Sequence, residues 1–240
     1  MKAKLVSKGM ALFGLTVLPV AANVVYQQAS VYVPPNGVAG ISWTSVFSNT
    51  DGGFQTFDNF SVPNASHVNV VQWEGFYRDD INSANNPVPP STVTWDLSFS
   101  ADNSGAPGAS LYDIQESAAS VSTTKLGTTV RGTDTVFVYQ FTATLPTAFS
   151  VAANTTYWFS PLSLQPSSDP ILVWVQGTGG DGISFQNDLN PGGGIAQSFV
   201  RADDRAFTLI STPEPNTAFL LGILLAGILG RHYHRKAARN

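Results

Sequence analysis

The feature that most constrains the fold of this 240-residue chain is an alternation of apolar and polar residues with a period of two. It is clearest in Thr92–Ser100 and Thr135–Leu145, where every second residue is apolar. Successive side chains of a strand point to opposite faces, so each segment predicts a strand with one buried face. The buried rows would be Val93, Trp95, Leu97 and Phe99 in the first strand, and Phe137, Tyr139, Phe141, Ala143 and Leu145 in the second.

The rest of residues 23–211 predicts further strands and no helix. Clusters of Gly, Asn, Asp and Pro separate these strands, as is typical of turns. About ten strands in one body predict an all-β fold, an antiparallel β-sandwich with jelly-roll-like connections. The other strand candidates are Val24–Val33, Ile41–Phe47, Phe54–Val62, Val68–Tyr77, Thr155–Leu164, Ile171–Gln176, Gly182–Gln186 and Arg205–Ile210.

The composition of this body argues against nucleic-acid binding and excludes cysteine chemistry. Between residues 23 and 212 there are five Lys and Arg residues and fifteen Asp and Glu residues, a formal charge of −10. Such a surface would repel phosphates, so no nucleic acid is expected as a partner. The chain has no Cys, which excludes disulfides, thiol chemistry and Cys-ligated metals.

Both ends of the chain have the pattern of targeting segments. Residues 1–22 combine three lysines, an apolar stretch over residues 10–20 and small residues at 20–22, which predicts a helical signal peptide. Cleavage after Ala22 would release an ectodomain of residues 23–211. At the other end, Pro213 and Pro215 cannot lie inside a β-ladder, so the folded body is expected to end before them.

Residues 212–240 continue with an uncharged apolar stretch over residues 218–230 and a basic end. The apolar stretch predicts a transmembrane helix, with a buried core helix of the same length as the alternative. The basic residues would stop the helix in the membrane and remain in the cytoplasm. They are Arg231, Arg235, Lys236 and Arg239.

The motif Pro213-Glu214-Pro215, the apolar stretch and the basic end together resemble the PEP-CTERM sorting signal of Gram-negative bacteria. The sequence His232-Tyr233-His234 departs from the usual arginine-rich end of that signal. The resemblance implies recognition by an exosortase and cleavage near the Pro-Glu-Pro motif. It also implies a membrane-anchored precursor, exported to the cell surface or extracellular matrix in organisms that make exopolysaccharide.

The body resembles a recurring secreted bacterial β-sandwich module that precedes such sorting tails. This resemblance covers Phe54 to Phe185 and implies a fold, but it brings no established activity or catalytic residues. The segments that carry it are Phe57–Pro63, Val70–Tyr77, Asp102–Gly108 and Asn154–Trp158.

Candidate catalytic residues are few, and we expect a non-enzymatic protein. His67 is the single His of the body and has no Gly-x-Ser-x-Gly motif to accompany it, so we interpret it as a solvated loop residue. Glu74 and Glu116 are the two body glutamates and the pair of carboxylates that glycoside hydrolysis would need. Alternatively, Glu74 lies on the polar face of a half-buried strand.

Acidic and amide residues in glycine-rich loops offer the oxygen ligands that calcium accepts. These residues lack the ordered spacing of a calcium-binding loop, so we interpret them as Asx turns. We therefore expect no metal or other cofactor. Calcium binding is the alternative. The groups are Asp79, Asp80 and Asn82; Asp102 and Asn103; and Gly180–Gly182 with Asn187 and Asp188.

The aromatic content bears on function. Trp158 and Trp174 alternate with apolar neighbours, so they would either fill the core or form a platform on which sugar rings stack. We expect an exported, exosortase-processed surface or matrix protein that is associated with exopolysaccharide and biofilm. The alternatives are a carbohydrate-binding module with a defined glycan and, third, a polysaccharide-acting enzyme.

Overall fold

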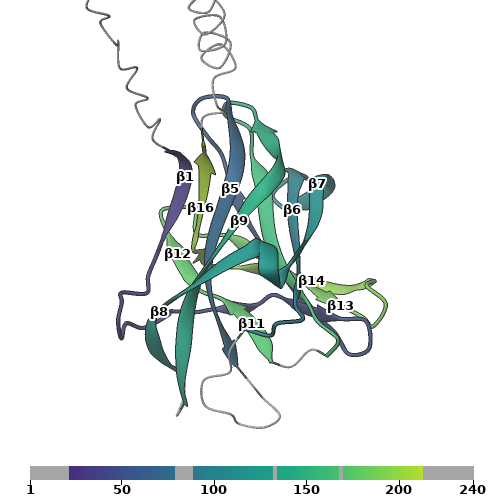
Figure 1. The fold of residues 1–240 in the computed structure, drawn as a ribbon. Helices are drawn as coiled ribbons and strands as arrows, with labels where there is room; N and C mark the ends of the chain where they lie inside the picture. Colours follow the sequence, from purple (N-terminus) through teal and green to yellow (C-terminus); the bar gives the residue numbers. More distant parts are fainter. Residues whose placement is uncertain (1–21, 79–88, 132–133, 168–169, 213–240) are drawn as a thin grey trace, which may run out of the picture. The chain divides into compact units, whose positions relative to one another are not determined.

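The computed structural model describes residues 22–78, 89–131, 134–167 and 170–212. These residues form sixteen strands in two sheets, and the predicted all-β class is confirmed (Figure 1). A three-residue 3-10 turn lies at Ala118–Ser120. The strands are β1 (Asn23–Ser30), β2 (Trp43–Thr44), β3 (Val46–Ser48), β4 (Gly52–Phe60), β5 (Ser66–Arg78), β6 (Thr94–Asp102), β7 (Pro107–Ser117), β8 (Val121–Arg131), β9 (Asp134–Val151), β10 (Tyr157–Leu164), β11 (Ile171–Trp174), β12 (Gln176–Thr178), β13 (Ser184–Leu189), β14 (Ile195–Arg201), β15 (Asp204–Arg205) and β16 (Phe207–Ser211).

The predicted targeting segments lie outside the described residues, apart from Ala22 and Thr212. This applies to the signal peptide helix, the Pro213-Glu214-Pro215 motif, the transmembrane helix and the basic residues Arg231, Arg235, Lys236 and Arg239. Among the residues that the structure does describe, no helix is long and apolar enough to cross a membrane.

The nine-stranded sheet is built around β5. Its strands follow the order β15-β12-β1-β16-β5-β11-β2, with β9 paired to β5 and β8 paired to β9. The thirteen residues of β5 pair with β9 along most of their length, and with β16 and β11 over two successive shorter parts. In the antiparallel pair of β1 and β16, Asn23 lies opposite Ser211, so the body begins and ends on neighbouring strands (Figure 1).

The seven-stranded sheet follows the order β14-β13-β4-β3-β10-β6-β7, and β4 also pairs with β10. Its named strand pairs are antiparallel except for β3 and β10, which run parallel. Seven of the eight residues of β10 are buried. Burial on both faces explains why this strand is apolar on both faces, unlike a strand with one solvated face.

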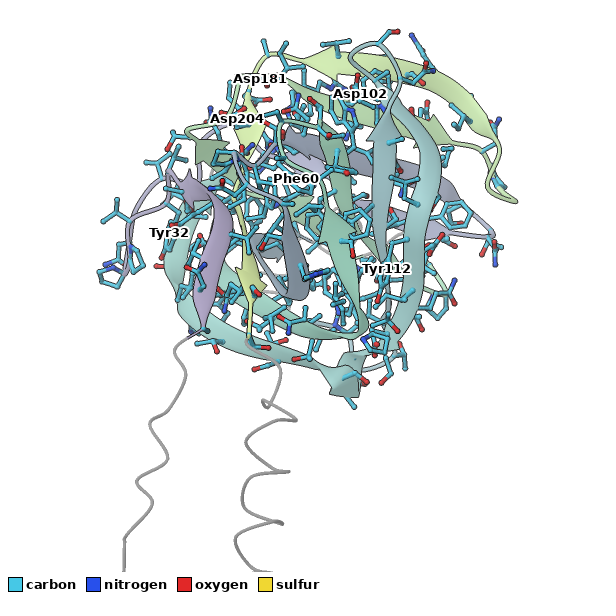
Figure 2. The ribbon with its side chains drawn as sticks, turned by 90° about the horizontal axis from the view of Figure 1, so that it is seen from above. Tyr32, Phe60, Asp102, Tyr112, Asp181 and Asp204 are labelled. Atoms are coloured by element: carbon cyan, nitrogen blue, oxygen red, sulfur yellow. The ribbon has the colours of Figure 1, made fainter. Side chains whose placement is uncertain are left out.

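An aromatic core fills the space between the two sheets. Trp73 of β5 and Trp95 of β6 come from different sheets, and their ring centroids lie 4.8 Å apart. The ring centroid of Phe60 of β4, which is labelled in Figure 2, lies 6.2 Å from that of Phe207 of β16. The predicted buried row of Thr92–Ser100 is confirmed, since none of its members is more than 3% exposed. That row consists of Val93, Trp95, Leu97 and Phe99.

A smaller apolar cluster lies on the outer face of the nine-stranded sheet. The connection from β1 to β2 supplies Tyr32 and Ala39, which pack against Phe76 of β5 and Val138 of β9. The Tyr32 hydroxyl donates to the carbonyl oxygens of Pro35, at 2.9 Å, and Thr128, at 3.2 Å. This connection therefore covers part of the outer face of that sheet.

Three strands of seven or more residues are missing from the sequence-based prediction: β7, β8 and β14. Both β7 and β14 are edges of the seven-stranded sheet, and β8 pairs with β9 alone. The residues of β8 and β14 are largely exposed, so burial imposes no apolar alternation on them. In β7 the inner face is only half-buried, and its apolar residues there are Tyr112 and Ile114.

Candidate ligand-binding groove

The outer face of the seven-stranded sheet carries the most distinctive polar group of the described residues. In β6, Trp95, Leu97 and Phe99 point into the core, so Asp96 and Ser98 point outward. The strand register puts Asp96 opposite Leu162 of β10 and Ser98 opposite Ser160. Carboxyl, hydroxyl and aliphatic groups therefore share one outward-facing surface.

A groove of about 420 Å³ runs across this face. Strands β3, β4, β6, β7 and β10 contribute to it, and so do residues of the hairpin formed by β13 and β14. The lining residues are polar and apolar in similar numbers, and none is Lys or Arg. They are Phe47, Asn49, Gln55, Asp96, Gln115, Leu162, Leu164, Gln165, Leu189, Gly193 and Ile195.

The amide side chains of the groove differ in the hydrogen bonds that they already make within the chain. The Gln165 amide donates to Ser163 Oγ at 2.9 Å and to the Pro170 carbonyl at 3.2 Å, so it is fixed by this chain. Gln55 Nε2 donates to Ser160 Oγ at 3.3 Å, at the long end of hydrogen-bond distances. Gln115 is exposed on the edge strand β7. Gln55 and Gln115 are therefore the amides best placed to bond to a ligand.

Asp96 meets a second carboxyl on the neighbouring strand. Asp113 of β7 lies opposite Ser98, and its side chain contacts that of Asp96. Burial, and next the charge of Asp113, raise the pKa of Asp96 to about 7. Two carboxyls in contact are stable only if they share a proton or receive a cation.

The described groups around Asp96 and Asp113 leave some hydrogen-bonding atoms without a partner. Asp96 Oδ1 is buried and receives no N–H or hydroxyl donor from the described residues. The Ser98 hydroxyl, in a residue that is 6% exposed, also has no partner there. Buried polar groups are nearly always paired, so this part of the groove has spare hydrogen-bonding capacity.

A sugar platform at Trp158 or Trp174 is wrong, because both side chains are fully buried. Trp158 points outward from β10, but its ring packs against Phe185 of β13 and its Nε1 donates to Asp102 Oδ1 at 2.9 Å. Trp174 lies between the sheets and donates to the Ala206 carbonyl at 2.9 Å. Neither ring has a face on which a sugar can stack.

The structure does not bring the three candidate catalytic residues together. His67 is exposed and lies on β5 rather than in a loop, with its Nδ1 3.0 Å from Ser150 Oγ. Glu74 is half-buried on the outer face of the nine-stranded sheet, because its neighbour Trp73 points into the core. Glu116 lies on β7 of the other sheet, opposite Trp95 and hence on the core side. The two glutamates therefore point in different directions from different sheets.

Two of the described calcium candidates, Asp102 and Asp181, are engaged in hydrogen bonds within the chain. Asp102 accepts from Trp158 Nε1 and from the Gly105 N–H. Asp181 accepts from Asn59 Nδ2, at 2.8 Å, and from the Ile183 N–H, at 2.9 Å. Asp79, Asp80 and Asn82 lie outside the described residues. Over the described ranges, no group of three His, Cys, Asp or Glu residues is placed to hold a metal ion.

A second acidic cluster is buried around Arg205. Its Nη2 pairs with Asp203 Oδ2 at 2.6 Å, and its Nη1 donates to the carbonyls of Ile41, at 3.0 Å, and Trp174, at 3.2 Å. Trp43 Nε1 donates to Asp203 Oδ1 at 2.9 Å. This cluster ties β2, β11 and β15 together.

Two further carboxylates in the cluster accept backbone hydrogen bonds. Asp58 accepts from the N–H groups of Asn59 and Arg205, and its burial raises its pKa well above the usual range. Asp204 accepts from the N–H groups of Gly180, at 3.0 Å, and Gly182, at 2.8 Å. Figure 2 shows Asp204 and Asp181 at the same end of the body. The glycine-rich loop is thus folded around a carboxylate of this chain.

No family model matches the chain, and no curated protein or solved structure matches it.

Sequence reasoning did not single out the groove. The only available hint was Asp96, a carboxylate in the outward row of Thr92–Ser100 whose other members are Thr and Ser.

Proposed function

We propose that this chain is an exported, non-enzymatic surface or matrix protein whose β-sandwich associates with exopolysaccharide through the groove on the seven-stranded sheet. The sandwich connects its strands in a jelly-roll-like manner. The tail is an exosortase substrate that anchors the precursor in the membrane before processing. The exosortase and the polysaccharide are the partners in this proposal, and no metal or other cofactor is needed.

The groove is the observation that carries the proposal. Polysaccharides present hydroxyl groups together with apolar C–H faces, and binding sites for such ligands combine a few polar groups with an apolar lining. Here Gln55, Asp96 and Gln115 supply the polar groups, while Phe47 and Leu162 supply apolar surface.

A co-sedimentation experiment with exopolysaccharide from a PEP-CTERM-bearing bacterium tests the binding part. We expect the full chain to sediment with the polysaccharide, and the double variant Gln55→Ala, Gln115→Ala to bind several-fold more weakly. The matched control is Gln72→Ala, which removes an amide from the outer face of the other sheet. Equal binding by both variants and the unmodified protein would remove the groove from the proposal.

Intact-mass analysis of exported protein tests the sorting part. The expected mass lacks residues 1–22 and everything beyond the Pro-Glu-Pro region. Exported material that retains residues 218–240 would contradict exosortase processing, whatever the outcome for the groove.

The groove also favours the second candidate, a carbohydrate-binding module with one defined glycan. Its polar and apolar lining residues have fixed positions, so they can match one arrangement of hydroxyl groups better than others. A glycan array separates the two. A single dominant glycan supports the defined module, and weak binding to many glycans supports general matrix association.

A further inference from the structure

We propose that the groove selects amine-bearing glycans, in which some sugar residues carry a free ammonium group, with Asp96 as the residue that determines this specificity. This inference rests on the proposed function, since it assumes that the groove binds a glycan, and it adds the chemical class of that glycan.

The first argument is the geometry of the acidic pair. Asp96 lines the groove, and Asp113 contacts it from the edge strand. An ammonium group carries three N–H donors and a positive charge, so one such group satisfies both carboxyls at once. The hydroxyl of Ser98, which lies opposite Asp113 on the same outward face, has no partner among the described residues.

The second argument is the charge of the lining. Asp96 is the one charged residue among the groove residues, and no Lys or Arg accompanies it. A polysaccharide with carboxylates or sulfates would bring like charge to Asp96 without any compensating cation. A neutral glycan would leave the contact between the two carboxyls as it is. A cationic glycan can take the place of the proton that the two carboxyls otherwise share.

The third argument is the contrast with the other acids of the body. Asp203 already pairs with Arg205, and Asp204 and Asp58 already accept backbone N–H groups. Asp96 Oδ1 in the groove has no such donor among the described residues. A bound ammonium group would supply the missing partner and lower the pKa of Asp96.

Isothermal titration calorimetry on the full chain, in buffer near neutral pH where Asp96 still carries charge, tests the proposal with three probes. They are a glucosamine hexamer, the corresponding N-acetylglucosamine hexamer and an oligogalacturonate of similar length. We expect the glucosamine hexamer to bind about tenfold more tightly than its N-acetylated counterpart, and the oligogalacturonate to bind least. Equal affinity for the first two probes overturns the proposal but leaves the groove as a glycan site. Failure of all three to bind removes the glycan function itself.

Variants locate the effect. Asp96→Asn should bring the affinity for the glucosamine hexamer down to that for the N-acetylated hexamer. The matched control, Glu116→Gln, removes the same charge from the core side of the adjacent edge strand and should keep the tenfold preference. If both variants lose the preference equally, the charge of the whole body causes it and the proposal is wrong.

Two further variants keep the test valid if Asp96→Asn fails to fold. Asp113→Asn changes an exposed residue of the same pair and should also reduce the preference. Gln115→Lys adds a cation to the groove wall and should weaken binding of the glucosamine hexamer while strengthening that of the oligogalacturonate. A preference that survives both substitutions overturns the proposal.

Discussion

The two acidic clusters of this protein are built in opposite ways. Around Arg205, Asp203 has a guanidinium partner, and Asp58 and Asp204 accept backbone N–H groups, so those carboxylates are satisfied by the chain itself. In the groove, Asp96 contacts another carboxyl, Asp113, and its Oδ1 has no hydrogen-bond partner among the described residues. The first arrangement fixes loops and short strands in place. The second leaves a buried carboxylate oxygen without a donor among the described residues, and we propose that it binds a ligand.

The largest expected effect comes from removing the cation of the buried acidic cluster around Arg205. Arg205→Met leaves Asp203 buried without its cation, so we expect a loss of about 4 kcal/mol in the free energy of unfolding, because an uncompensated buried charge is costly. Urea denaturation measures this loss. Arg201→Met is the matched control, since Arg201 stacks on the Trp43 ring and is only partly buried. A loss of similar size in both variants would show that the cluster is no more than a surface contact.

The next effect concerns Trp158, which joins the groove face to the loop at Asp102. Trp158→Phe removes the indole hydrogen bond and part of the buried ring, and we expect a loss of about 2 kcal/mol in stability. Affinity for any glycan should not change, because the ring has no exposed face. A glycan affinity that disappears without loss of stability would restore the surface platform.

A smaller effect is expected from the pH dependence of stability. The folded-state pKa of Asp96 is raised to about 7, whereas an unfolded Asp titrates near ~3.9. The folded state therefore holds a proton that the unfolded chain has released, so this stabilising contribution is complete below about pH 4 and is lost as the pH rises through about 7.

Asp96→Asn should flatten that part of the stability profile by about 1 kcal/mol, after allowance for solvent screening at a half-buried group. Thermal unfolding across this pH range is the measurement, and Glu116→Gln should leave the profile unchanged. If the stability of Asp96→Asn still falls with pH as steeply as that of the unmodified protein, another group is responsible for the pH dependence. Asp58 is one such group, because burial also raises its pKa.

The smallest effect is expected at Ser98. Its hydroxyl is buried without a partner, so Ser98→Ala removes an unsatisfied group and should leave stability unchanged or raise it by about 0.5 kcal/mol. Chemical denaturation with replicate measurements resolves this difference. A clear loss of stability would mean that the hydroxyl is bonded in the folded protein.

The sequence predicts the core of this fold better than its edges. Trp95, Leu97 and Phe99 alternate strictly because one side of β6 meets the other sheet. Strand β14 lies at an edge, where exposed residues need not alternate, and its pattern gave no prediction. Trp158 shows the limit for sites, because its burial depends on Phe185, which is distant in the sequence. The groove was not predictable for the same reason: Gln55, Asp96 and Gln115 are ordinary polar residues until the strand order brings them together.

The register of Asn23 opposite Ser211 has a mechanical consequence. When two antiparallel neighbours are pulled apart from adjacent ends, the load falls on one hydrogen-bonded pair after another, as in opening a zipper, rather than on the whole ladder at once. A body held by both ends would therefore peel open under low force. A body held through Ser211 alone transmits the load along β16 into β5, the strand with the most partners in its sheet, and withstands much more.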